Sequence, residues 1–346
     1  MKYIKNIVLF TVLSIVIVGC GTNESGSSKD DASPVEEDQI VLKLSNDSTD
    51  ANAKVKAALR WAELVEEKSD GRLVIEVYDS AQLYNDEDAI QAVGMGNIDL
   101  ALPPPNLLSS VDPNWGLFEL PSLFGIDYDQ YRQVVEGEIG EILAEGLEEK
   151  LGVKVIGHYH AGNYLIANNN KMIEKPEDLK GEKIRIIGGL INEAFIKEFG
   201  AGPTQIPWPE VYTALQQKTI DGVETTMSGA NQINGWEVMD YVAYTKHKQS
   251  SYTMIMNKDS WENLPEDLQE ILLETYEESR VYQDDLIEQI DIEGVKNFEE
   301  NGSEVLEYTS EDLEPFKEVF MQIEDELVEK ANIDKDIVEK IESTIN

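Results

Sequence analysis

The stretch KIRIIGG, Lys183 to Gly189, places a single arginine between isoleucines. Such flanks predict a strand that enters a core, where a guanidinium is costly unless an anionic group meets it. Gly188 and Gly189 would let a ligand approach the backbone closely. A planar, two-pronged donor in a poorly hydrated place is what capture of a carboxylate requires. From the residues alone, a structural ion pair between Arg185 and one of the 68 acidic residues is an equally good interpretation.

Candidate catalytic groups are few. The sequence lacks G-x-S-x-G, the P-loop, H-E-x-x-H and C-x-x-C, which mark common hydrolase, nucleotide, metal and redox sites. His158 and His160 alternate along one predicted strand and so share a face, but a metal ion needs further ligands that this spacing does not supply. Lining of a cleft or ordinary packing is the better interpretation of the pair. We therefore predict no enzyme activity, no metal ion and no cofactor.

The elements that must position Arg185 alternate between strands and helices. Such alternation predicts parallel pairing with right-handed crossovers, and hence an open α/β sheet. In the first half we expect strands at 40–45, 72–79, 98–103 and 153–160, helices at 55–71, 88–96 and 131–152, and a packed loop at 117–125. The apolar face of the first helix comprises Val55, Ala58, Leu59, Ala62 and Val65. Asp86 or Asp88 is expected to cap the second helix.

A second α/β unit begins near Ala161 and the chain then returns to the first. The expected elements are strands at 182–187 and 220–226, helices at 191–200 and 210–219, and a loop at 201–209. YTMIMN, Tyr252 to Asn257, has the pattern of a strand that rejoins the first sheet. From Pro265 no helix breaker occurs until Gly294, which predicts a helix far longer than three or four turns. A strand at 304–309 and an acidic amphipathic helix end the chain.

The first 20 residues have the layout of a secretory signal. Lys2 and Lys5 precede the apolar run IVLFTVLSIVIV, which is too short and wrongly flanked for a stable membrane span. Cys20, the only cysteine, follows Ile17-Val18-Gly19 as the acylated cysteine follows the lipobox of bacterial lipoproteins. We therefore expect residues 1–20 to be a lipoprotein signal peptide with lipid attachment at Cys20.

The charge of the chain limits its partners. The 28 Lys and Arg residues face 68 Asp and Glu residues, which gives a formal net charge of -40. So acidic a surface argues against nucleic acid and against electrostatic adhesion to anionic lipids. The acyl chains on Cys20 are then the membrane link, and the small, polar and acidic segment 21–38 is expected to be a flexible tether. This arrangement predicts a protein anchored to the outer face of the cell membrane.

Several ordered motifs resemble one family. GEKIRII is followed by FGAGPTQIPWPEVYTALQQKTIDGVET, and upstream the chain carries WAELVEEKSDGRLVIEVYDSAQL, AVGMGNIDLAL and LFELPSLF. These segments resemble, in the same order, the landmarks of the solute-binding proteins of tripartite ATP-independent periplasmic (TRAP) transporters, the DctP family. The likeness extends from about Ile40 to the end of the predicted long helix.

The resemblance implies an extracytoplasmic solute receptor with a two-lobed α/β fold of the periplasmic-binding-protein type. Hinge strands would join the lobes, and a long helix would span both. On this basis we assign residues 39–158 plus 249–290 to lobe I and residues 159–248 plus 291–346 to lobe II. A small organic acid would bind in the cleft, and the closed receptor would present it to the small and large membrane subunits of the permease.

Residue roles also come from the resemblance. In the family the arginine of the K-I-R strand forms a salt bridge with the substrate carboxylate, which corresponds to Arg185 here. Trp208 stands where the family usually has an aromatic residue beside the ligand, and Glu210 and Tyr212 match the E-V-Y that follows. Two polar residues of the first lobe, Asn46 and Asn106, are further substrate-binding candidates.

Two departures from the family pattern bear on the ligand. Many members have a second arginine at the end of the hinge strand, where this chain has Asn163. After D-G-x-E many have Asn, and this chain has Thr225. Fewer donors for a second anionic group favour a monocarboxylate over a C4-dicarboxylate or sialic acid. Members that bind 2-oxo acids with a metal ion tend to have Trp at the position of Thr225. This chain has no Trp there, so a 2-oxo acid bound together with a metal ion is a less favoured ligand.

Three other functions compete with this interpretation. A solute-binding lipoprotein of an ATP-driven (ABC) importer would have the same two-lobed architecture with a ligand cleft. A secreted hydrolase or lyase that acts on an organic acid would need a nucleophile or an acid–base pair, and the sequence offers neither. A surface adhesion lipoprotein would have no affinity for small molecules.

Overall fold

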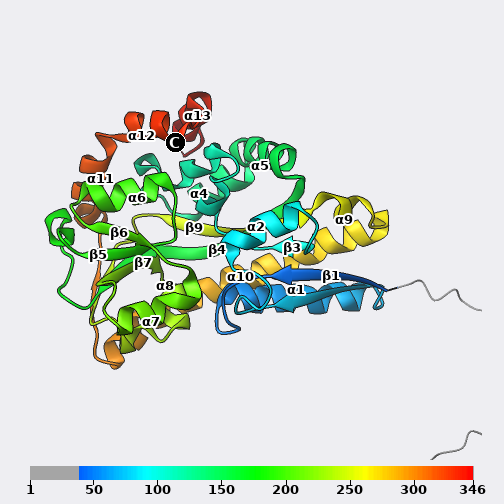
Figure 1. The fold of residues 1–346 in the computed structure, drawn as a ribbon, viewed down its shortest axis with the longest axis horizontal. Helices are drawn as coiled ribbons and strands as arrows, with labels where there is room; N and C mark the ends of the chain where they lie inside the picture. Colours follow the sequence, from blue (N-terminus) through cyan, green and yellow to red (C-terminus); the bar gives the residue numbers. More distant parts are fainter. Residues whose placement is uncertain (1–38, 346) are drawn as a thin grey trace, which may run out of the picture. The chain divides into compact units, whose positions relative to one another are not determined.

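A computed structural model of the chain describes residues 39–345 (Figure 1). The predicted signal peptide, Cys20 and the tether at 21–38 lie outside the described residues. Within the described part, ten strands join in one sheet of mixed direction. The strands are β1 (Ile40–Ser45), β2 (Leu73–Tyr78), β3 (Leu100–Ala101), β4 (Val153–Asn168), β5 (Lys183–Ile186), β6 (Gly202–Gln205), β7 (Gly222–Thr226), β8 (Tyr241–Tyr244), β9 (Gln249–Asn257) and β10 (Glu304–Glu307).

The sheet has two halves that share the 16-residue strand β4. In the first half the order is β2-β1-β3-β9-β4, and in the second it is β4-β7-β5-β6, with β8 and β10 to one side. Residues 153–163 of β4 pair with β9, whereas residues 164–168 pair with β7 and β8. The predicted α/β class and the two-lobed fold are confirmed, and the return of the strand at 252–257 to the first half is confirmed as β9.

The pairing direction was only partly predictable. Strands β1, β2 and β3 are parallel, as are β5, β6 and β7. The expectation of parallel pairing is wrong for β4, which is antiparallel to β9, β7 and β8. The physical reason is that β4 takes its partners from segments far along the chain, so local alternation of strand and helix carries no information about their direction.

The helices cover the sheet as the sequence indicates, with local differences. They are α1 (Ala53–Lys68), α2 (Asp86–Gly94), α3 (Pro105–Leu108), α4 (Tyr128–Glu136), α5 (Glu138–Leu151), α6 (Leu190–Glu198), α7 (Val211–Gln216), α8 (Met227–Gln232), α9 (Lys258–Glu262), α10 (Glu266–Glu300), α11 (Ser310–Met321), α12 (Glu324–Ala331) and α13 (Lys335–Ile345). Short 3-10 turns are η1 (Pro113–Glu119), η2 (Pro121–Leu123), η3 (Pro176–Leu179), η4 (Trp208–Glu210) and η5 (Gly235–Glu237).

Four local predictions need correction. The helix expected at 131–152 is interrupted at Gly137, which has an extended conformation and separates α4 from α5. Helix α2 is capped by the side chain of Asn85 rather than by Asp86 or Asp88. The loop expected at 201–209 contains β6. Leu59 is 42% exposed, because α1 is rotated to bury Trp61, whose indole donates to the carbonyl oxygen of Leu272 at 3.1 Å.

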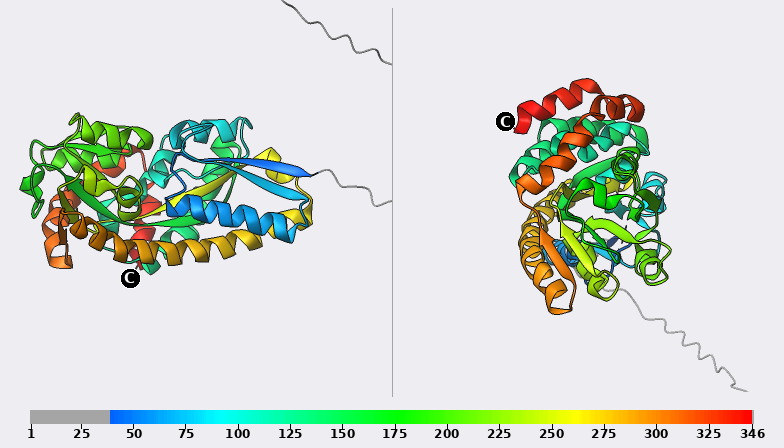
Figure 2. Two further views of the ribbon diagram at one scale, coloured as in Figure 1. Left: turned by 90° about the horizontal axis from the view of Figure 1, so that it is seen from below. Right: turned by 90° about the vertical axis from the view of Figure 1, so that its left-hand side faces the viewer.

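The predicted long helix is confirmed as α10, 35 residues in length. It packs against α1 and β4 and also against α8 and β10, so it contacts both halves of the sheet. Figure 2 shows α10 alongside α1 and continuing past the second half. The last helices complicate the predicted lobe boundary, since α13 packs on α4 and α5 while α12 packs on α6. The lobe boundaries therefore stay predictions.

Gly157 allows α10 to pack closely against strand β4. The ring of Tyr276 stacks on Tyr159 of β4 with centroids 4.9 Å apart, and the Tyr159 hydroxyl lies 2.6 Å from the Ser279 hydroxyl. A Cβ at Gly157 would lie 2.3 Å from the Tyr276 ring, which is closer than real Cβ contacts allow. The absence of a side chain at Gly157 therefore sets how closely helix and strand approach.

We expect Gly157→Ala to lower the free energy of unfolding by about 1 to 3 kcal/mol, because the buried Tyr276 ring must move to admit a methyl group. Urea unfolding followed by circular dichroism measures this. Gly202→Ala in β6 is the matched control, since its nearest neighbour would be 3.9 Å away. It should change stability by less than about 1 kcal/mol. Equal effects of the two variants would contradict the packing argument.

Candidate functional site

A cavity of about 60 Å³ lies between residues of the two halves of the sheet. A water molecule needs roughly 10–15 Å³ of such volume, so there is room for about five waters or a small organic molecule. The lining residues are Asp47, Ser48, Asn52, Lys54, Asn85, Asp86, Glu87, Pro104, Leu107, Tyr164, Arg185, Ile187, Gln205, Ile206, Pro207, Trp208, Thr225, Thr226, Gly229, Ser250 and Tyr252.

Arg185 projects from β5 into this lining and is only 2% exposed. Its Nε donates to the carbonyl oxygen of Ile206 at 2.9 Å, while its buried Nη1 has no hydrogen-bond partner among residues 39–345. No acidic side chain among residues 39–345 forms an ion pair with it, so the alternative of a structural ion pair has no support in the described part of the chain. Burial lowers the pKa of Arg185 to about 10, and Tyr164 and Asp47 oppose that shift.

Trp208 and Thr225 join Arg185 in the cavity wall. The guanidinium carbon of Arg185 lies 5.2 Å from the centre of the Trp208 ring, a distance typical of a cation–π contact. A Cβ at Gly229, the first turn of α8, would lie 2.6 Å from the Thr225 hydroxyl and 3.2 Å from the Trp208 ring. Glycine at this position therefore leaves space for both side chains.

The two first-lobe candidates lie beside the cavity rather than in its lining. Asn46 is fully buried; its side-chain oxygen accepts from the backbone of Ser48 at 3.1 Å, and its amide nitrogen has no partner within the described residues. Asn106 donates to the carbonyl oxygen of Gly188 at 3.1 Å and lines an adjoining hollow of about 360 Å³. That bond connects α3 with the glycines that follow β5, so Asn106 links the two walls.

Three of the predicted residues are not brought to the cavity. The Asn163 amide lies between Gln249 and Asp291 in a separate hollow beside α10. Tyr212 donates its hydroxyl to Glu237 at 2.8 Å, and Glu210 is exposed.

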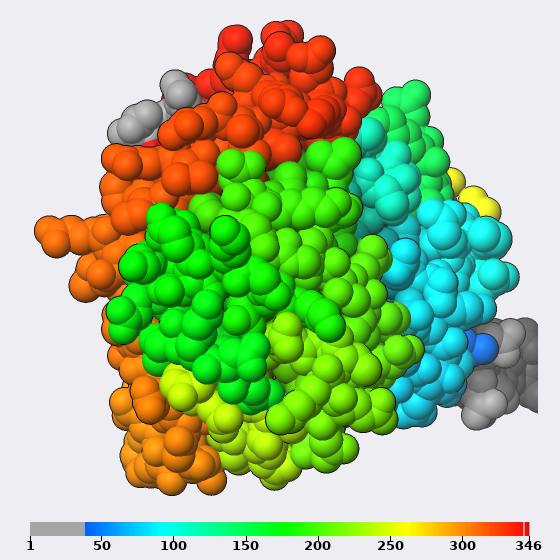
Figure 3. Space-filling model, turned by 60° about the vertical axis from the view of Figure 1, so that its left-hand side comes forward, coloured from blue at the N-terminus to red at the C-terminus, as the bar shows by residue number. Residues whose placement is uncertain are grey.

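The two walls are in direct contact around the cavity. Gln205 reaches Glu87 at 3.4 Å, and the side-chain amides of Asn52 and Gln232 meet at 2.7 Å. In the space-filling view, the segment containing α2 and α3 (cyan) abuts the segment that follows β6 (green) (Figure 3). Hydrogen bonds across the boundary are what a closed binding cleft requires.

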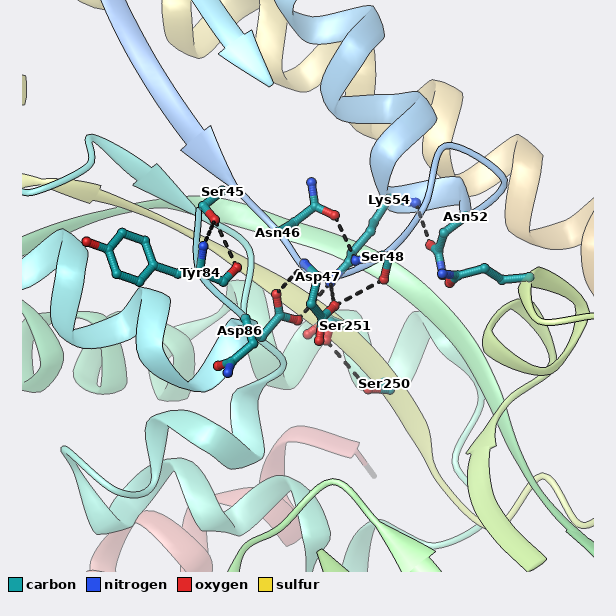
Figure 4. Close-up of polar contacts among 12 residues, drawn as sticks. Ser45, Asn46, Asp47, Ser48, Asn52, Lys54, Tyr84, Asp86, Ser250 and Ser251 are labelled. Carbon is teal, nitrogen blue, oxygen red and sulfur yellow. Dashed lines mark hydrogen bonds and ion pairs between the residues drawn. The ribbon is translucent and has the colours of Figure 1, made fainter. Parts of the chain in front are cut away.

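Sequence reasoning missed a buried charge cluster in the same lining. Lys54 donates to Asp86 at 2.7 Å and to Asp47 at 3.2 Å, and these three residues, named the Lys54 cluster here, are grouped in Figure 4. Burial lowers the pKa of Lys54, but the two carboxylates outweigh burial and raise it overall. Burial and the charge of Asp47 raise the pKa of Asp86 to about 7, against the effect of Lys54.

A signal for Lys54 was present in the sequence. It lies four residues before Ala58 and seven before Trp61, which places a lysine on the buried stripe of α1. A lysine on an apolar stripe is almost never fully buried unless it is paired. The pattern therefore pointed to a partnered internal cation, although not to the identity of its partners.

A second buried cluster joins segments of both halves. Lys248, which precedes β9, pairs with Glu119 of η1 and with Glu224 of β7, the latter at 2.9 Å. His247 lies 3.0 Å from the same Glu224 oxygen. Burial raises the pKa of Glu224, but Lys248 and His247 reverse this and lower it to about 2. These four residues are named the Lys248 cluster.

The remaining histidines pack within the protein. His158 contacts Thr253 and Trp115, whereas His160 stacks on Tyr128 with ring centroids 3.7 Å apart. Burial lowers the pKa of both to about 4, so both are neutral at pH 7. Residues 39–345 contain no group of three or more His, Cys, Asp or Glu side chains arranged to hold a metal ion. The described helices include none long and apolar enough to cross a bilayer.

Comparison with known proteins identifies the class. Residues 44–331 match the DctP family, described as bacterial extracellular solute-binding protein, family 7. The chain belongs to this family and is an extracytoplasmic solute receptor of the TRAP type, a class that works with membrane permease subunits and is not enzymatic. The interpretations as a receptor of an ATP-driven importer, a hydrolase or lyase, and an adhesion protein are thereby set aside.

Particular relatives support this placement. The chain is 28% identical over 305 residues to the C4-dicarboxylate-binding protein DctB of Bacillus subtilis, covering 85% of this chain and 87% of the relative. It is 29% identical over 302 residues to the C4-dicarboxylate-binding periplasmic protein DctP of Rhodobacter capsulatus, covering 86% and 89%. A TRAP periplasmic solute-binding protein from Sulfurospirillum deleyianum, solved with bound succinate, is similar in structure with a TM-score of 0.82 and 27% identity, covering 89% and 99%.

We expect Lys248→Met to lower the free energy of unfolding by about 3 to 5 kcal/mol, because it leaves Glu119 and Glu224 buried without their shared cation. Lys246→Met is the control: Lys246 is two residues away, its side chain is 40% exposed, and its pair with Glu307 should be worth at most about 1 kcal/mol. Chemical denaturation measures both variants. A Lys248 variant as stable as the Lys246 variant would show that the cluster is not needed for folding.

Proposed function

We propose that this receptor captures a small organic acid, with Arg185 holding the carboxylate. The observation that supports this most directly is the buried guanidinium whose Nη1 has no partner and which lines the cavity. A bound carboxylate would supply the missing acceptors and the missing negative charge together. The relatives named for C4-dicarboxylates and the related structure with succinate support an organic acid as the class of ligand.

Within this class we favour a monocarboxylate over a dicarboxylate. Among the described residues that line the cavity, Arg185 is the one lysine or arginine without a carboxylate partner, since Lys54 is paired with Asp47 and Asp86. Thr225 adds a hydroxyl rather than a second cation, and Asn163 lies in another hollow. One free cation matches one carboxylate.

The remainder of the ligand would rest against Trp208 and be enclosed when the two walls meet. Closure around the acid would then present a single compact form to the permease subunits. The hydrogen bonds across the cavity boundary, such as Asn106 to Gly188, support this mode of enclosure.

We expect Arg185→Ala to weaken binding by roughly thirty-fold to a few thousand-fold, because loss of one partner of a buried charge pair costs about 2 to 5 kcal/mol. Arg185→Lys should also lose affinity, since an ammonium cannot reproduce the two-pronged contact. A thermal-shift screen of mono- and dicarboxylates, sugar acids and sulfonates first supplies the ligand. Isothermal titration calorimetry then compares the variants.

Tyr212→Phe serves as the control for this comparison, because Tyr212 bonds to Glu237 and does not line the cavity. Its affinity should equal that of the unmodified protein. Unchanged affinity in Arg185→Ala, in a protein that still unfolds cooperatively, would remove Arg185 from the site.

The proposal includes a lipid anchor at Cys20, supported by the lipobox pattern Ile17-Val18-Gly19-Cys20. Lipidation would hold the receptor near its permease at the outer face of the membrane. We expect Cys20→Ser to abolish incorporation of labelled fatty acid and to move the protein from the membrane fraction to the soluble exported fraction. Ser14→Ala, within the apolar run, should leave both unchanged. Membrane retention of an unlabelled Cys20→Ser protein would contradict the anchor.

A further inference from the structure

The wall that faces the ligand from the first half of the sheet is built around the Lys54 cluster. Asp47 follows β1, Lys54 begins α1, and Asp86 begins α2, so three separate elements bring their charges together (Figure 4). Lys54 is 1% exposed, and its ammonium also lies 4.4 Å from the centre of the Tyr252 ring. Two carboxylates and an aromatic face therefore occupy this cation fully.

The cluster carries more negative than positive charge. One ammonium faces two carboxylates, and Glu87 is a further acid in the lining. The raised pKa of Asp86, whose causes are burial and then the charge of Asp47, is consistent with this excess. Burial lowers the pKa of Arg185, and the charges of Tyr164 and Asp47 oppose that shift, so this carboxylate acts on the guanidinium across the cavity. Arg185 and the three residues of the Lys54 cluster line the same cavity of about 60 Å³, so one small molecule can contact both walls.

The charges of this wall favour some chemical groups over others at the end of the ligand that lies away from Arg185. A second carboxylate would meet two like charges and a lysine that is already paired, which disfavours its ionised form. An ionised carboxylate has about four lone-pair sites, so Asp47 and Asp86 can still accept from neutral donors. Hydroxyl groups are such donors, and Ser48 already donates its hydroxyl to Asp47 at 3.2 Å.

We propose that the Lys54 cluster is a specificity-determining subsite for hydroxyl groups, so that the ligand is a small hydroxylated monocarboxylate rather than a dicarboxylate. This inference rests on the proposed capture of the carboxylate by Arg185. It adds the far end of the ligand, with Asp47 and Asp86 as hydroxyl acceptors and Lys54 as the group that holds both carboxylates in place.

The proposed hydroxyl subsite is tested by measuring the binding of three four-carbon acids to the full-length protein in detergent. The acids are D-erythronate, butyrate and succinate. They share chain length and differ at the far end, which is hydroxylated, apolar or carboxylate. By calorimetry at pH 7.5 we expect erythronate to bind at least tenfold more tightly than either of the others. The proposal would be overturned if succinate or butyrate bound as tightly as erythronate. It would also be overturned if none of the three acids bound at millimolar concentration.

Variants of Asp47 and Asp86 test whether the Lys54 cluster causes the preference for erythronate over succinate. Asp47→Asn and Asp86→Asn remove one negative charge each with little change in shape, and each should weaken erythronate at least tenfold while weakening succinate less or strengthening it. Asp88→Asn is the matched control: it removes a charge from the same turn of α2, is exposed, and does not line the cavity. An unchanged ratio of erythronate to succinate affinity in both cluster variants would refute the subsite. Should neither variant fold, the order of the three acids in the unmodified protein decides.

Arg185→Ala separates this inference from the proposed function. If it abolishes binding of whichever acids bind, while succinate is preferred to erythronate, the carboxylate site stands and the hydroxyl subsite fails. If Arg185→Ala leaves the affinities unchanged, the proposed function fails, whichever far end is preferred.

Discussion

The candidate site depends on the guanidinium of Arg185, which is buried without a carboxylate partner in the described part of the chain. A charge removed from water is strongly destabilising unless it is compensated, and Arg185 receives only a carbonyl oxygen from Ile206 and the face of Trp208. Both contacts come from the segment that follows β6, so they orient the side chain and leave its Nη1 without a partner. In the proposed function a ligand carboxylate would supply the missing acceptor and the missing negative charge, and binding would draw its energy from that compensation.

Two buried lysines in the described part of the chain follow the opposite rule. Lys54 and Lys248 each have two carboxylate partners within the protein. In a chain with 68 acidic residues, an internal partner for Arg185 would have been easy to supply. The paired lysines connect separate elements of the walls, whereas Arg185 has no carboxylate partner among residues 39–345, which supports the proposal that its partner is a solute.

Sequence patterns predicted the parts of this arrangement that are local. Residues alternating in strand β5 placed Arg185 in a core, and the uninterrupted run after Pro265 predicted α10. They did not reveal the partners of Lys54, because Asp47 and Asp86 meet it only after β1, α1 and α2 have packed. The antiparallel direction of β4 and the location of Asn163 depend on distant segments in the same way, so a motif position alone could not place that side chain in the cavity.

Strand β4 joins the two halves through an irregular point that α10 covers. Strand β4 passes from the first half to the second, and its register with β9 shifts between His160 and Gly162. Gly162 has φ of 91°, and a Cβ there would lie 3.2 Å from Ile287 and Asp291 of α10. A bend at this irregular point would change the distance between Arg185 and the Lys54 cluster and leave the pairing within each half intact. Because Ile287 and Asp291 of α10 lie directly against Gly162, such a bend would have to displace the helix together with the strand.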